Sequence, residues 1–567
     1  MKRSPLLVLL AVLAIGSMLL SQYAVSAQEA KKDHKKSETD AAPAAMGQDW
    51  SKMRDGLNDV FSQLQKEAGI KASRVCDDDT FMRRVYLDLV GRPPLPEEIE
   101  EFNPGKKDSE GRKGNEKREA LIDKLLATPE HAEHFADWWT VTLIGRDADG
   151  NSKRYLRQYL KESFAENKPW SEMVFDMVGG QGRTPDNPEI GYLMSFENRK
   201  TDMAGVTSKV FLGKQIQCAQ CHDHPYEDWT TDDFEGMEAF FKLFNTGAKG
   251  DGADRYWYTR DQVVHNKHEA SAKVRLKGKY MFPTYLGRQT WEFEDGDNLR
   301  VSLAKWMTSK DNGWFRNMTV NRYMAYFLGM GFVTPVDDFN SINTPTFPVV
   351  LEMMGKDFAA SGYDTNYLIR AICTSELYQR EVDTNRTNRD DFKYYSHSFV
   401  KRLTPEQIQR SILHVVGVER LNKMEFVRDA ETDKMTPDEK KVKDTNNQIN
   451  GWKSNIGRLM RDAYGADPQM YEFGNFDGTI IQALMMMNAD LMGPGNLKNC
   501  VRDIMDRYSK PADRITHIFM TVLGRRPSKV DIAILNGTVA RWGGESEDAY
   551  TDLVVALMNT TEFITNH

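Results

Sequence analysis

Signals that start and stop α-helices recur along most of this chain, and they limit its fold more than any other sequence feature. Thr128-Pro129-Glu130 supplies a capping hydroxyl, a proline and a carboxylate in the order that favours a helix start. Helical spacing of apolar residues runs from Phe81 to Leu89, with further helices expected near 155–164, 172–177 and 207–211. Because 567 residues are too many for one compact core, we expect a mainly α protein with two helical domains.

Two short patterns occur more than once along the chain. Residues 87–94 resemble residues 520–527, and both predict a helix that stops at glycine and restarts near proline. Residues 126–130 are echoed at 372–376 and at 558–562. Such reuse favours a structural role over a functional one.

The sequence predicts five successive segments. Aromatic and β-branched residues alternate between residues 253 and 294, which favours short strands between the helical regions. The expected order is a signal peptide (1–27), a disordered tether (28–48), a first helical domain (49–245), a small β-containing connector (246–296) and a second helical domain (297–567). The second domain carries a charged insertion at 422–455.

The first 27 residues have the form of a secretory leader. Lys2 and Arg3 precede an apolar run at 5–20, and Val25-Ser26-Ala27 has small residues where a signal peptidase cuts. An uncleaved anchor is the weaker alternative, since a spanning helix needs about 20 apolar residues. We therefore expect a periplasmic or otherwise extracytoplasmic protein with no stable membrane span after removal of the leader.

Composition argues against nucleic-acid binding and against a fold stabilised by disulfides. The formal net charge is −8, which argues against a nucleic-acid partner. Five cysteines are few for an exported protein, and an odd number cannot form a complete set of intrachain disulfides. The fold is therefore not expected to depend on disulfides.

The segment Cys218-Ala219-Gln220-Cys221-His222 has the spacing of a c-type haem attachment site. Two cysteines separated by two residues can form both thioethers, and the following His222 can bind the iron. Zinc is an alternative, because Cys218, Cys221, His222 and His224 together offer two thiolates and two imidazoles. A thioredoxin-like redox pair is less favoured, because no βαβ pattern surrounds the cysteines.

The sixth iron ligand would decide between electron transfer and small-molecule activation, and the sequence does not choose it. His224 is too near His222 to reach the opposite haem face, so we interpret it as a pocket residue. Met237 lies in a phenylalanine-rich stretch typical of core. The candidates are His131, His134, His265, His268, Met237 and Met281.

Two other groups of residues have a functional and a structural interpretation. Asp337 and Asp338 could serve acid–base chemistry or a hard cation, but a turn or cap paired with Arg322 is favoured. Four tryptophans could line a haem pocket or bind sugar, although core packing is the commoner role. These are Trp138, Trp139, Trp170 and Trp229.

Several motifs resemble a known family. In the first domain they are residues 81–94, Asn167-Lys168-Pro169-Trp170, and above all Val210-Phe211-Leu212-Gly213 leading into residues 217–225. In the second domain they are residues 303–306, 320–322, 335–339, 368–372, 402–407 and 523–527. Over nearly the whole mature chain the sequence resembles the planctomycete-type cytochrome-c-like proteins of unknown function.

This resemblance implies a PSCyt-type N-terminal domain, cytochrome-c-like and helical, with a PSD-type C-terminal partner domain. Met324 and Tyr326 depart from the family, which usually has Trp and His there, and Phe347 stands where a His-Pro pair is usual. The family implies an exported haem-type protein but names no substrate.

The leading hypothesis is therefore an exported protein with one covalent haem c, held by Cys218 and Cys221 and ligated by His222. It would carry out electron transfer or oxidative chemistry with a redox partner or exported substrate. A second hypothesis is a zinc-dependent hydrolase or metal-binding protein. A third is a non-catalytic cell-surface or polysaccharide-binding scaffold. The sequence does not establish whether the protein is an enzyme.

Overall fold

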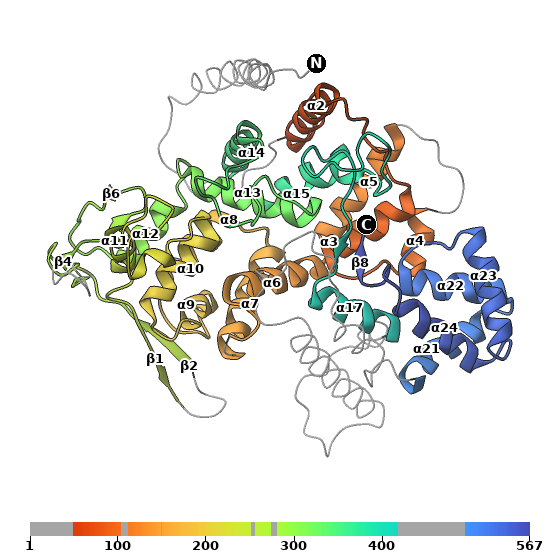
Figure 1. Cartoon of the computed structure of the whole chain (residues 1–567). Coiled ribbons are helices and arrows are strands. Elements are labelled where there is room, and N and C mark those ends of the chain that lie inside the picture. The colour runs from red at the N-terminus through yellow and green to blue at the C-terminus, as the bar shows by residue number, and fades with distance from the viewer. Residues whose placement is uncertain are drawn as a thin grey trace, which may run out of the picture.

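A computed structural model describes residues 49–103, 112–148, 150–250, 256–270, 272–273, 280–417 and 494–567. The described chain is mainly helical, with small two-stranded antiparallel sheets, which confirms the predicted fold class (Figure 1). The predicted signal peptide (1–27), tether (28–48) and charged insertion (422–455) lie outside these residues.

The helices before the strands are α2 (Trp50–Ala68), α3 (Asp78–Val90), α4 (Pro96–Phe102), α5 (Arg112–Leu126), α6 (Pro129–Ile144), α7 (Gly150–Ala165), α8 (Trp170–Gly179), η1 (Pro188–Ile190), α9 (Gly191–Met194), α10 (Lys200–Leu212), η2 (Gln217–Gln220) and α11 (Thr231–Ala239). The helices after them are α12 (Leu299–Met307), α13 (Gly313–Leu328), α14 (Pro348–Ala360), α15 (Thr365–Cys373), α16 (Glu376–Gln379), α17 (Pro405–Val416), α21 (Pro494–Arg507), α22 (Pro511–Leu523), α23 (Lys529–Arg541) and α24 (Glu547–Met558).

The strands of the described residues form four antiparallel pairs. Three of them are hairpins in the region between the helical parts, where the sequence predicts short strands, and β1 and β2 project from the helical body in Figure 1. They are β1 (Asn245–Lys249) with β2 (Tyr256–Arg260), β3 (Ala272–Lys273) with β4 (Tyr280–Met281), and β5 (Thr284–Tyr285) with β6 (Gln289–Thr290). The fourth pair joins distant segments, β7 (Lys401–Arg402) and β8 (Thr565–Asn566).

The predicted start and stop residues occupy helix ends. The Thr128 hydroxyl accepts a hydrogen bond from the His131 amide at 3.3 Å, and Pro129 is the first residue of α6. Gly91 ends α3 and Gly524 ends α22, with φ of 75° and 67°. This left-handed backbone costs glycine little, so the chain can leave both helices abruptly.

The repeated sequence patterns form one repeated arrangement. After α3, Arg92 lies 2.9 Å from Glu98 and 3.1 Å from Glu130. After α22, Arg525 lies 2.5 Å from Glu562 and 3.7 Å from Asp531. In each case the arginine that follows the helix-stopping glycine joins the next helix to the later acidic residue, so the echo is structural.

The apolar core does not divide at the strand region. One cluster of buried residues extends from Met53 to Tyr395 and also includes Met520. A second cluster extends from Leu403 to Phe563 and includes Leu87 of α3. Helix α3 therefore contacts both clusters, with Leu87 and its neighbours at their boundary.

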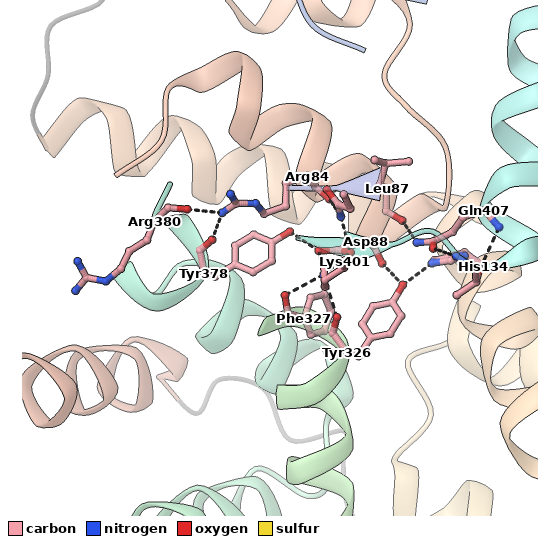
Figure 2. A network of polar contacts seen from close by, with 12 residues as sticks. Arg84, Leu87, Asp88, His134, Tyr326, Phe327, Tyr378, Arg380, Lys401 and Gln407 are labelled. Atoms are coloured by element: carbon pink, nitrogen blue, oxygen red, sulfur yellow. Dashed lines mark hydrogen bonds and ion pairs between the residues drawn. The ribbon is translucent and has the colours of Figure 1, made fainter. Parts of the chain in front are cut away.

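A polar network occupies this boundary (Figure 2). We call it the buried junction and define it as Asp88, Tyr326, Tyr378, Lys401 and Asn566. The Lys401 ammonium lies 2.8 Å from both carboxylate oxygens of Asp88 and donates to the carbonyls of Tyr326 and Phe327 at 3.0 and 2.9 Å. The junction thus ties α3 to α13 and to β7.

Candidate functional site

The cysteine motif lies on a short exposed turn directly after α10. Gly213 ends α10 with φ of 67°, and the chain then forms the 3-10 turn η2. Cys218 and Cys221 are exposed free thiols, whereas Ala219 between them is buried and fixes the turn to the core. One turn of chain therefore presents both sulfur atoms to solvent.

Hydrogen bonds indicate the tautomers of the two histidines that follow. His222 Nδ1 lies 2.8 Å from the carbonyl oxygen of Asp223. A carbonyl can only accept, so Nδ1 carries the proton and Nε2 keeps a lone pair. His224 Nδ1 instead accepts from the amides of Tyr226 and Glu227, at 3.2 and 3.0 Å, so its neutral ring carries the proton on Nε2.

A hollow of about 250 Å³ adjoins the motif. Tyr226 and Ile342 line it, and at 79% and 81% they have the largest exposed fractions among the exposed large apolar side chains of the described chain. Exposed apolar side chains around a hollow are typical of a surface that binds something. The complete lining is Gln215, Cys218, His224, Tyr226, Glu227, Trp229, Asp338, Phe339, Asn340 and Ile342.

A loop from the second helical region closes one side of this hollow. The Phe339 amide donates to the carbonyl of Gly213 at 3.0 Å, and Lys214 Nζ donates to the carbonyl of Phe339 at 2.9 Å. The Glu227 carboxylate accepts from the Ser341 amide at 3.0 Å and also from the Ser341 hydroxyl. We call the motif, the hollow and this loop the cysteine site.

Both charged groups that hold the loop have perturbed acidity. The hydrogen bond from the Ser341 hydroxyl favours the carboxylate and lowers the pKa of Glu227. Burial disfavours the ammonium and lowers the pKa of Lys214. Lys214 nevertheless donates to the Phe339 carbonyl. Lys214 and Glu227 therefore both hold the loop against the motif.

The cysteine site offers the kinds of donor that covalent haem attachment uses. Among the described residues, no three or more histidine, cysteine or acidic side chains are gathered as a metal site. Haem attachment needs only two accessible sulfurs and one imidazole nitrogen. Cys218, Cys221 and the Nε2 of His222 meet that need, and metal-binding histidines commonly donate Nδ1–H to a carbonyl, as His222 does.

None of the five sixth-ligand candidates whose side chains the structure describes lines the hollow. His131 and His134 are buried in the core, and burial lowers their pKa values to about 4 and about 3. His131 contacts the Leu89 carbonyl, and His134 the Tyr326 hydroxyl.

The remaining candidates are likewise engaged elsewhere or not described. Met237 is fully buried, which confirms its predicted place in the core. His265 pairs with Asp295 at 3.1 Å, and the His268 ring lies against Phe282. The side chain of Met281 lies outside the described residues.

The carboxylate pair and the tryptophans divide between structure and site. Asp337 lies 3.3 Å from Arg322, the predicted salt bridge, whereas Asp338 lines the hollow. Trp139 and Trp170 are buried with ring centroids 4.1 Å apart. Trp138 packs against the same core, and Trp229 lines the hollow.

The residues that complete the cysteine site carry little signal in the sequence. Tyr226 and Glu227 follow the motif closely, and their nearness to it was the available signal. The loop at 339–342 lies more than 100 residues further along the chain, and no spacing pattern connects the two segments.

Fold and site together define a helical protein that presents an exposed Cys-x-x-Cys-His turn between two regions. Residues 57–246 match the family model PSCyt2, described as a protein of unknown function (DUF1549). Residues 299–539 match PSD1, described as a protein of unknown function (DUF1553). The chain therefore carries the PSCyt and PSD domains in tandem. No curated protein and no solved structure matches it.

Proposed function

We propose that this protein is exported and carries one covalent haem c at the cysteine site. Cys218 and Cys221 form the thioethers, and His222 Nε2 binds the iron. The observation that supports this most is the pairing of two exposed thiols on one turn with an imidazole whose other nitrogen is fixed by the Asp223 carbonyl.

The haem supplies redox chemistry when bound, either electron transfer or oxidative chemistry. The chain's own residues shape its surroundings. His224 keeps a proton on Nε2 and can donate to a molecule in the hollow, because its Nδ1 is occupied by two backbone amides. Tyr226 and Ile342 offer apolar surface that a porphyrin or a redox partner would cover.

The N-terminal segment also supports the proposal. The leader-like residues 1–27 would direct the protein out of the cytoplasm, where c-type haem is attached. Among the described helices, none is long and apolar enough to cross a bilayer.

The proposal is tested by secretion in a host that has a c-type haem maturation system. Haem staining after denaturing electrophoresis should give a coloured band, and Cys218→Ala or Cys221→Ala should weaken or abolish it. Cys500→Ala is the matched control and should keep the colour. A colourless protein with stoichiometric zinc would support the metal-binding alternative. A protein with neither group would favour the scaffold alternative, and either result overturns the haem proposal.

A further inference from the structure

The buried junction brings together an amine, an amide and a carboxylate from three distant segments. Asp88 of α3, Lys401 of β7 and Asn566 of β8 are 2%, 7% and 1% exposed. In the antiparallel pair of β7 and β8, Lys401 lies directly opposite Asn566. Side chains at opposite positions share one face, with Cβ atoms about 5 Å apart.

Asp88 contacts both of the other side chains. Lys401 Nζ lies 2.8 Å from Asp88 Oδ1, and Asn566 Nδ2 lies 2.8 Å from the same oxygen. The amine and the amide are therefore neighbours across one carboxylate atom. The amide oxygen of Asn566 is buried without a hydrogen-bond donor, an arrangement that costs free energy and is rare in folded proteins.

Burial reduces the free-energy cost of proton transfer from Lys401 to Asp88. Burial raises the pKa of Asp88 and lowers the pKa of Lys401, so both changes favour a neutral acid beside a neutral amine. The tyrosines Tyr326 and Tyr378 enclose the pair, and the Tyr378 hydroxyl donates to Asp88 Oδ2 at 2.9 Å. Because the three side chains are buried, water would not compete with the Lys401 amine for the amide carbon of Asn566.

We propose that Lys401 and Asn566 form an intramolecular isopeptide bond, with Asp88 transferring the protons. The neutral Nζ of Lys401 attacks Cγ of Asn566 and forms a carbon–nitrogen bond. Asp88 accepts a proton from Nζ and delivers one to Nδ2. The bond from Cγ to Nδ2 then breaks and one ammonia leaves. Asp88 returns to its initial state, and no oxidant or reductant takes part.

The bond would join two distant segments of this chain covalently. None of the five cysteines does so, because none is paired in a disulfide. A link between residues 401 and 566 would close a long loop and hold the C-terminal strand on β7, which limits the freedom of the unfolded chain. The proposal is independent of the haem proposal, because the two groups of residues share no side chain.

Peptide mapping of the purified full-length protein by tandem mass spectrometry tests the proposal. We expect one branched peptide that joins residue 401 to residue 566 and lacks the mass of one ammonia. Intact mass alone is insufficient, because cleavage after Ala27 would leave Gln28 at the N-terminus, where cyclisation also loses ammonia. Separate, unlinked peptides at 401 and 566 would overturn the proposal. A link from Lys401 to Asp88 with loss of water would overturn the assignment of Asn566.

Variants show which groups carry the reaction. Asp88→Asn keeps the size of the side chain but cannot transfer protons, so it should yield the two peptides unlinked. Asn566→Ala should do the same because it lacks the reacting amide. Asn559→Ala removes another C-terminal asparagine, whose amide caps α24, and should keep the link. If the junction variants do not fold, the wild-type peptide map still decides the question.

Discussion

The cysteine site and the buried junction both join the first helical region to the second, but they do so with opposite chemistry. At the buried junction every described polar contact of Lys401 lies in the core, and its Nζ reaches four oxygen atoms. At the cysteine site the thiols and the His222 ring face solvent, and the fixed groups are backbone and loop. The difference teaches that buried and exposed polar groups serve different ends here: the junction holds the fold, and the exposed turn is left accessible.

The largest effect should follow from breaking the buried junction. Lys401→Met leaves Asp88 buried without its Lys401 partner and removes the proposed link, and we expect a loss of about 3–5 kcal/mol in the free energy of unfolding. Urea unfolding followed by circular dichroism measures it. The control is Lys356→Met at an exposed pair with Glu352, 3.4 Å apart, which should cost about 0.5 kcal/mol or less. Equal losses in the two variants would show that the buried Asp88–Lys401 contact stabilises the fold no more than an exposed ion pair does.

Acid should weaken the region around the junction through His134. Burial lowers the pKa of His134 to about 3, whereas the pKa of a histidine in the unfolded chain is about 6.5. Between these values the unfolded chain binds a proton that the folded chain does not, so stability falls as pH decreases. Burial of His131, with a pKa of about 4, acts in the same direction.

The variant His134→Gln isolates this effect, because its amide can still donate to the Tyr326 hydroxyl. Between about pH 7 and about pH 4, its urea midpoint should decline less than that of the wild type. Parallel declines would show that His134 does not contribute to the acid sensitivity.

An intermediate effect is expected where the cysteine site meets the loop of the second region. Gly213→Ala places a side chain in left-handed backbone, which costs about 1–2 kcal/mol, and its Cβ would lie 2.7 Å from Phe339 Cδ2. Gly69→Ala has a similar φ of 71° but meets no atom within 4 Å. Gly213→Ala should therefore lower the thermal midpoint more than Gly69→Ala. Similar shifts would mean that the Phe339 contact is easily relieved.

The smallest effect should come from the exposed clamp at the same site. Glu227→Gln weakens the hold on Ser341, and we expect a stability change within about 0.5 kcal/mol. Hydrogen exchange should nevertheless become faster at the Ser341 amide. In the wild type this amide donates to the Glu227 carboxylate at 3.0 Å. Glu197→Gln, at an exposed pair with Arg199, should leave that amide unchanged. Unchanged exchange in Glu227→Gln would show that the loop is held by other contacts.

Local features of this fold follow from the sequence, whereas the long-range contacts do not. Thr128 and Gly91 mark helix ends because caps depend on residues a few positions apart. The Cys-x-x-Cys-His turn at Cys218 is likewise a local pattern. The contact of Gly213 with Phe339 and the pairing of Asp88 with Lys401 join segments far apart in the chain, and nothing in either segment specifies its partner. The position of Asp88 between two leucines indicates that it is buried, but it does not indicate which residue pairs with it.

The central claim is that the exposed turn, unlike the buried junction, is where a cofactor is attached. The most direct measurement is tandem mass spectrometry of the proteolytic peptide that spans residues 217–223, taken from protein secreted in a haem-maturing host. The account predicts a peptide that carries one haem on Cys218 and Cys221 together. The unmodified peptide, with two free thiols or a disulfide, would contradict it.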